Sequence, residues 1–261
     1  PIHAHGWDFN DAPLPYLAML NSGYKDAGVQ VSWVVPATLY IQLGAEVLRG
    51  DSFPAANGAE SSGTGASTAF VHFGGDVGAE ASWRAGLSFL TADANDRATD
   101  FDSSRVSFTG KSDLAIADFV WKWAKNGNAR DRYYVVQAEY LRRDEDGELT
   151  LSVPPAGDAT HAYAGTQDGF YVQGVYQFRP RWRVGLRYDR LDASNDLGAV
   201  APTPFVADHD PSRVSVMTDF SNSEFSRLRL QLNRDDSRPE TDDQVVVQYI
   251  MSLGAHGAHR F

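Results

Sequence analysis

The stretch RWRVGLRYDR, residues 181–190, has an alternating pattern in which every second side chain from Trp182 to Tyr188 is apolar. Trp182, Val184, Leu186 and Tyr188 fall on one side of an extended chain, and the side chains on the other are charged except at Gly185. A period of two residues is typical of a β-strand with one apolar and one polar face, because successive side chains of a strand point in opposite directions. The stretch therefore predicts a strand that separates an apolar environment from an aqueous one.

The same alternation recurs along the chain, in runs of roughly the 9–11 residues that cross a bilayer at a tilt. No run of about 18 apolar residues exists, so no transmembrane helix is expected. We predict an all-β fold, a transmembrane antiparallel up-and-down β-barrel with at least 11 strands in this chain. The predicted strands cover residues 28–35, 38–49, 67–77, 81–91, 113–123, 132–143, 169–178, 181–190, 213–221, 226–233 and 244–261.

The connections between these runs alternate between short and long, as they do in transmembrane barrels with short periplasmic turns and longer extracellular loops. A soluble sandwich or barrel has no reason to place its long loops at one end. The short connections lie near residues 36–37, 78–80, 126–130, 179–181 and 222–225. The long ones cover residues 50–66, 92–111, 144–167 and 192–211, with a shorter one at 235–243.

Aromatic residues of the apolar face gather near strand ends, which predicts two interfacial bands around an aliphatic belt. The alternative is that these rings fill the core of a sandwich. The last run ends on an apolar-face aromatic, Phe261. A terminal Phe of this kind resembles the signal that the barrel-assembly machinery reads. We therefore expect a multi-pass barrel in the outer membrane of a Gram-negative bacterium, with lipid and lipopolysaccharide around it.

An odd number of strands does not suit a closed single-chain bacterial barrel, which normally has an even number. Residues 1–27 alternate poorly and include Pro13 and Pro15, and proline is unfavourable in a paired strand. We expect this segment to be a loop that can fold into the lumen, followed by barrel strands and long extracellular loops over residues 28–261. The chain then forms part of a larger, even-stranded barrel.

Composition limits the other classes of function. The formal net charge of −11 argues against a nucleic-acid partner, and the chain has no cysteine for a disulfide framework or a thiolate metal site. A homo-oligomer agrees with a transmembrane barrel, but no residue pattern requires one.

Several segments resemble one group of Gram-negative outer-membrane proteins, often labelled zinc-regulated TonB-dependent receptor-like or porin-like. The resemblance spans nearly the whole chain, and it implies a barrel with extra strands before residue 5. A TonB-dependent receptor needs a plug and a periplasmic contact box, and the sequence shows neither, so the layout is closer to that of a porin. The resembling segments are HGWDF (5–9), DAPLPY (11–16), SDLAIADFVWKW (112–123), YQF (176–178) with RWRVGLR (181–187), and QYIMSLGAHGAH (248–259).

The polar face of the barrel should line its lumen. Its arginines concentrate on three consecutive strands, where they could attract anions or could instead brace the barrel as an internal salt-bridge lattice. The long loops are acidic and could concentrate divalent cations at the mouth, or could only keep the loops soluble. The predicted pore-lining residues are Arg84, Lys122, Arg183, Arg187, Arg213, Arg227, Arg229, Glu46, Asp76, Asp118, Glu139, Asp189 and Asp219.

Histidines are the plausible ligands of a transition metal, and His3 and His5 share one face of an extended segment. They are the best candidates for a metal site, although no three ligands have recognisable spacing. His72 and Ser88 face inward on neighbouring strands without an evident third group, so an internal polar pair is favoured over catalysis. We expect no enzyme and no cofactor.

These patterns together predict a porin-like channel for small solutes or ions. The first alternative is a closed structural or binding barrel in an outer-membrane complex. The second is the barrel of a metal-linked (zinc) uptake receptor.

Overall fold

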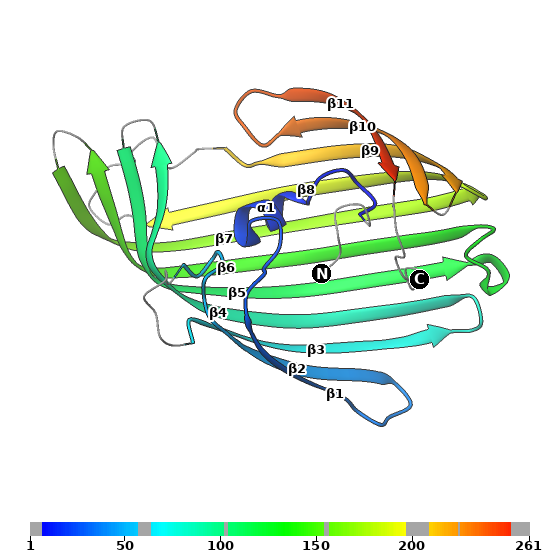
Figure 1. Ribbon diagram of the computed structural model, residues 1–261, viewed down its shortest axis with the longest axis horizontal. Coiled ribbons are helices and arrows are strands. Elements are labelled where there is room, and N and C mark those ends of the chain that lie inside the picture. The colour runs from blue at the N-terminus through cyan, green and yellow to red at the C-terminus, as the bar shows by residue number, and fades with distance from the viewer. Residues whose placement is uncertain are drawn as a thin grey trace.

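A computed structural model of the chain describes residues 7–56, 64–101, 104–153, 157–196, 209–223 and 225–251. One antiparallel sheet contains 11 strands, and each strand pairs with the next in sequence (Figure 1). The all-β, up-and-down prediction is therefore confirmed. The strands are β1 (Gly28–Val34), β2 (Tyr40–Leu48), β3 (Ala66–Val77), β4 (Ala81–Phe101), β5 (Ser104–Ala124), β6 (Tyr133–Val153), β7 (Gly157–Arg179), β8 (Trp182–Asp196), β9 (Ser212–Ser223), β10 (Ser226–Asp236) and β11 (Asp242–Met251).

The outer face of the sheet is apolar and exposed. On β8, Leu186 is 56% exposed, whereas Arg187 beside it is 1% exposed. Aromatic rings meet across strands toward both ends of this face. The Trp182 and Phe220 rings lie 4.9 Å apart near the short turns, and the Phe170 and Tyr188 rings lie 5.9 Å apart toward the other end. An exposed apolar belt between two aromatic bands is the surface that lipid covers.

Two predicted loops are wrong. The described residues of 92–111 and 144–167 continue the ladders of β4 with β5 and of β6 with β7, so these strands run well past the outer aromatic band. The extensions bend away from the rest of the sheet (Figure 1). On β5 and β6 their outer faces carry charged residues such as Lys111, Asp144 and Asp146, so the apolar side chains that mark a bilayer-crossing strand are missing there. Gly110 and Gly147 lie directly opposite each other, with each backbone too close for a Cβ atom on the other.

The segment before the sheet, residues 7–27, is not wholly a loop, because it contains helix α1 (Leu14–Leu20). Its prolines argued against a strand, yet Pro13 takes the N-cap position and Pro15 lies in the first turn, where proline is tolerated. Asn21 ends the helix in the left-handed conformation. Leu14, Met19 and Leu20 are buried, and α1 packs on β7 and β8. We call residues 7–27 the inner segment.

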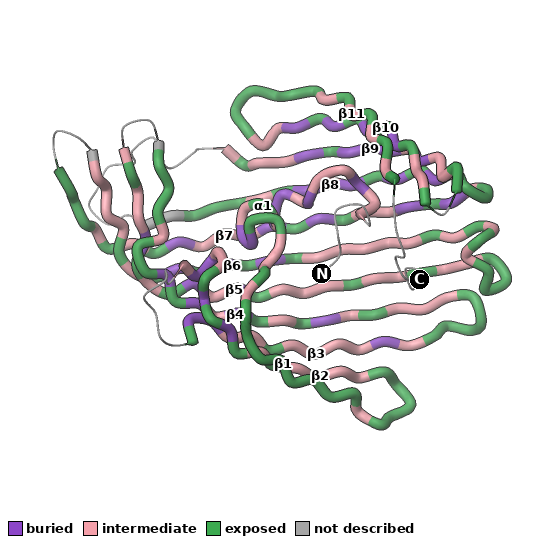
Figure 2. The backbone as a smooth tube through the Cα atoms, viewed as in Figure 1, coloured by how far each residue is buried: buried purple, intermediate pink, exposed green. Residues whose placement is uncertain are grey.

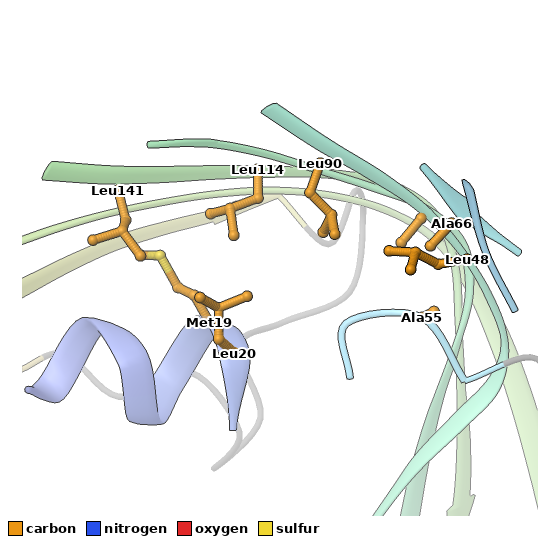
Figure 3. Packing of buried hydrophobic residues seen from close by; sticks show 9 residues of the cluster. Met19, Leu20, Leu48, Ala55, Ala66, Leu90, Leu114 and Leu141 are labelled. Atoms are coloured by element: carbon orange, nitrogen blue, oxygen red, sulfur yellow. The ribbon is translucent and has the colours of Figure 1, made fainter. Parts of the chain in front are cut away.

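Buried residues gather where the inner segment covers the sheet (Figure 2). Met19 and Leu20 of α1 and the wall residues Leu90, Leu114 and Leu141 point toward one another and form one apolar cluster (Figure 3). None of the helices in the described part of the chain has the length and hydropathy needed to span a lipid bilayer.

Candidate functional site

The concave face of the sheet, which we call the inner face, carries the 13 residues predicted to line a pore. Cross-strand pairing places many of them in rows of directly opposite residues. One row runs from His72 through Asp118, Glu139 and Asp189 to Arg213. Another joins Arg183, Asp219 and Arg229 on β8, β9 and β10. The structure thus brings the predicted residues together on one surface, but it divides them into two walls.

The first wall consists of Arg183, Arg187, Arg213, Arg227 and Arg229, and we call it the arginine wall. Asp219 lies at its centre and is fully buried. Its carboxylate accepts hydrogen bonds from Arg183 and, at 2.9 Å, from Nε of Arg229, and Arg227 lies 3.6 Å away. The wall is therefore an ion-pair lattice in which one aspartate forms ion pairs with three guanidinium groups.

Two further carboxylates of the sheet complete the lattice. Nε of Arg187 donates to Asp189 at 3.0 Å, and both side chains are almost completely buried. Nη2 of Arg213 lies 2.8 Å from Asp235. The effective penalty for burying an isolated charge amounts to several kcal/mol, so these groups are tolerated inside the barrel because each one is paired.

The inner segment supplies the remaining partners of the arginine wall. Asp8 lies 2.8 Å from Nη1 of Arg183, and Asp11 bridges Arg187, at 3.0 Å, and Arg213. Backbone carbonyls take further donors, since Arg229 donates to the carbonyl of Trp7 at 2.8 Å and Arg187 donates to that of Asp11 at 2.9 Å. The guanidinium of Arg187 also lies 4.8 Å above the Phe9 ring.

The arginine wall is consequently neutral in formal charge. Its five guanidinium groups are matched by five carboxylates, three from the sheet and two from the inner segment. A solute anion would have to displace Asp8 or Asp11 to reach these arginines.

The second wall is the inner face of β2 to β6 between the aromatic bands, and we call it the open wall. Arg84 is 52% exposed and lies 3.6 Å from Asp118. Glu139 accepts hydrogen bonds from Tyr16 of the inner segment at 2.5 Å and from Tyr171 at 2.7 Å, with no ion pair in the described structure. The predicted pore-lining residues of the open wall have a net negative formal charge, because four are carboxylates and two are basic. They are Glu46, Asp76, Asp118, Glu139, Arg84 and Lys122.

His72 and Ser88 lie on neighbouring strands, as the sequence suggests, but they are not directly opposite. His72 faces Gly86, and Ser88 faces Phe70. Nε2 of His72 lies 3.8 Å from Asp118. Within the described residues no hydrogen bond joins Ser88 to His72.

Metal binding was expected at His3 and His5, which lie outside the described residues, as does Phe261. The part of the chain that the structure describes contains no group of three or more His, Cys, Asp or Glu side chains that could hold a metal ion.

A second buried network lies beyond the outer aromatic band, at the base of the long hairpins. Both carboxylate oxygens of Glu145 accept hydrogen bonds from Arg97, at 2.7 and 3.0 Å, and Ser112 donates to one of them at 2.9 Å. Burial alone would raise the pKa of Glu145, but the hydrogen bond from Arg97 and the charges of Arg143 and Arg97 outweigh it, so the pKa is lowered. Arg97 also donates to the carbonyl of Pro54 at 2.9 Å, which ties the loop after β2 to this network.

Sequence reasoning missed the contribution of the inner segment. Asp8, Asp11 and Tyr16 lie in a stretch without alternation, so no pattern assigned them to a face of the barrel. The sequence did contain one signal. Asp8 and Asp11, three residues apart, precede a sheet whose arginines are concentrated on three consecutive strands. That imbalance calls for acidic partners from elsewhere in the chain.

Comparison with known proteins agrees with this architecture. No family model matches the sequence. An uncharacterized protein of Aquifex aeolicus is 30% identical over 275 residues, a match that covers 99% of this chain and 56% of that protein. The chain thus spans about half the length of this relative.

Among solved structures, the loop L8 deletion mutant of OmpT, an outer membrane protein of Vibrio cholerae, aligns with a TM-score of 0.57 at 13% identity. The alignment covers 94% of this chain and 68% of that one. In-vitro folded OmpT aligns with a TM-score of 0.47 over 79% of this chain and 53% of that chain, at 13% identity. The sheet with its apolar outer face and the first of these likenesses define the class: the chain has the fold of an outer-membrane β-barrel.

Proposed function

We propose that the chain forms the wall of a porin-like channel in the outer membrane of a Gram-negative bacterium, and that the channel passes small solutes with a preference for cations. The observation that carries this proposal is the division of charge on the inner face. The arginine wall is neutralised by its own carboxylates, whereas the open wall keeps an excess of carboxylates. Pore-lining charges of one sign favour permeant ions of the other sign.

A channel also requires a closed barrel. Among the described residues, β1 and β11 each pair on one side only. Unpaired backbone groups cost several kcal/mol each in lipid, so both edges need partners. In an antiparallel sheet the first and eleventh strands run in the same direction, so an odd number of further antiparallel strands must lie between them. If a second copy in the same membrane orientation closed the barrel, its β1 would lie parallel to β11 of the first copy. Closure by further antiparallel strands of the same protein is therefore favoured.

The test is the current carried by the purified full-length protein in a planar bilayer under a gradient of potassium chloride. We expect steady conductance and a reversal potential of the sign that indicates cation preference. A variant with Asp8→Asn and Asp11→Asn removes two carboxylates from the arginine wall, so its reversal potential should shift toward anion preference. Anion preference of the unsubstituted protein would contradict the proposed selectivity.

A second candidate function is a closed structural or binding barrel. The observation in its favour is the fit of the inner segment, which is held to the arginine wall by ion pairs and to the wall near α1 by Met19 and Leu20. Absence of conductance from correctly folded protein would reject the channel and favour this candidate. A metal-linked uptake barrel stays a prediction without support from the described residues.

A further inference from the structure

A cavity of about 230 Å³ lies between the end of the inner segment and the inner face of β2 to β5. Leu20 and Tyr24 of the inner segment form one side of it. Leu90, Leu114 and Ile116 form much of the opposite side. Figure 3 shows how Leu20 approaches Leu90 and Leu114 from α1. An apolar cavity of roughly 150 Å³ holds a benzene molecule, so this one has room for a single aromatic ring with a short polar arm.

An aromatic ring, Phe70, contributes to the lining. It lies across Gly44 on the neighbouring strand, where a Cβ atom would approach the ring to 2.2 Å. Glycine at position 44 therefore lets the ring lie close against β2. Aromatic faces attract cations, because the ring carries negative charge density on its faces.

The cavity also contains one carboxylate, that of Glu46. Thr68 donates a hydrogen bond to it at 2.9 Å, and no basic side chain of the described residues forms an ion pair with it. Glu46 therefore differs from the carboxylates of the arginine wall, each of which forms an ion pair with a guanidinium group. Glu46 is thus a negative charge with a free oxygen at the edge of an apolar, ring-lined space.

We propose that this cavity is a binding site for a small organic monocation, namely a primary ammonium group joined to an apolar body such as a single aromatic ring. The ammonium group would lie at Glu46, and the apolar body would lie against Phe70, Leu90 and Leu114. This inference rests on the proposed cation preference of the channel and narrows it to a class of solute. A carboxylate solute would meet Glu46 and be repelled.

The experiment measures equilibrium binding of three matched probes to the full-length protein in detergent, by ligand-observed nuclear magnetic resonance. The probes are benzylammonium, benzyl alcohol and benzoate, which share a ring and differ in charge. We expect benzylammonium to bind at least about tenfold more tightly than benzyl alcohol, since a bond to a charged group is stronger than one to a neutral group, and benzoate not to bind. Equal affinity for the three probes, or no saturable binding of benzylammonium, would overturn the proposal.

Two variants locate the site. Glu46→Gln should remove most of the preference for benzylammonium while leaving the affinity for benzyl alcohol unchanged, which also reports that the cavity is intact. Asp76→Asn is the matched control, since Asp76 is an inner-face carboxylate outside the cavity lining, and it should change neither affinity. Ser88→Phe should fill the cavity and abolish binding of both probes. Retained benzylammonium binding in Ser88→Phe, or an unchanged preference in Glu46→Gln, would place the site elsewhere.

Binding in detergent does not depend on conductance. Selective benzylammonium binding by a protein without conductance would reject the channel and support this site. Conductance without selective binding would support the channel and reject this site.

Discussion

Replacing Asp219 by alanine should lower the free energy of unfolding by about 3–5 kcal/mol, the usual loss when one partner of a buried ion pair is removed. Asp219 is fully buried and serves Arg183 and Arg229, with Arg227 at 3.6 Å. Without it, three guanidinium groups on neighbouring strands repel one another, and Arg227 and Arg229 lose their nearest carboxylate. Urea unfolding of the protein folded into lipid vesicles, followed by tryptophan fluorescence, measures the loss.

The matched control for this substitution is Asp236→Ala on β10. Asp236 is partly exposed, lies 3.9 Å from the exposed Arg234, and accepts a hydrogen bond from Thr241 on the surface. An exposed pair of this kind contributes less than about 1 kcal/mol, so the control should unfold nearly as the unsubstituted protein does. Similar losses for both variants would contradict the view that the arginine wall is a lattice centred on Asp219.

The second large effect is expected on the outer face. Leu186→Arg should cost about 2–4 kcal/mol, because the new charge would lie in the hydrocarbon region between Trp182 and Tyr188. Leu186 is 56% exposed on the described surface, so the substitution disturbs no packed core. Its effect therefore comes from lipid rather than from steric conflict. The measurement is the same unfolding experiment in vesicles.

Depth in the membrane supplies the control for Leu186→Arg. Tyr188 lies in the outer aromatic band on the same strand and face, so Tyr188→Arg should place its charge near the lipid headgroups. A charge at the interface costs only about 0–1 kcal/mol, and the loss of the Tyr188 contact with the Phe170 ring adds to that cost. A cost for Leu186→Arg that does not exceed the cost for Tyr188→Arg would show that the outer face is not in contact with lipid.

The strands themselves could be predicted because the barrel imposes one physical rule on them. Residues such as Val184 and Leu186 must face lipid while Arg183 and Arg187 face inward, and this rule leaves a period of two in the sequence. This alternation is required only between the two aromatic bands, where the outer face contacts lipid. Residues 92–101 and 157–167 lie beyond them, where both faces can be polar, so their pairing left no such signal.

For the candidate site, the sequence predicts which side chains face inward but not which groups they contact. Alternation assigns a side chain to the inner face but does not say what lies opposite it across the lumen. The arginine wall was therefore compatible with an anion path and with a lattice, and only the position of Asp8 and Asp11 distinguishes the two. The cavity at Glu46 depends in the same way on where α1 ends, because Leu20 and Tyr24 form one side of it.

The assignment of the two faces predicts that the inner face of this sheet borders water and that the outer face borders lipid. The chain has no cysteine, so single cysteines can be introduced at Arg84 and at Leu87, which lie on opposite faces of β4. Both side chains are more than half exposed. We would treat each variant, in intact outer membranes, with a thiol reagent that dissolves in water and does not enter lipid. We predict that Arg84→Cys is labelled and Leu87→Cys is not; labelling of Leu87→Cys with Arg84→Cys protected would contradict the assignment of the two faces and, with it, the channel.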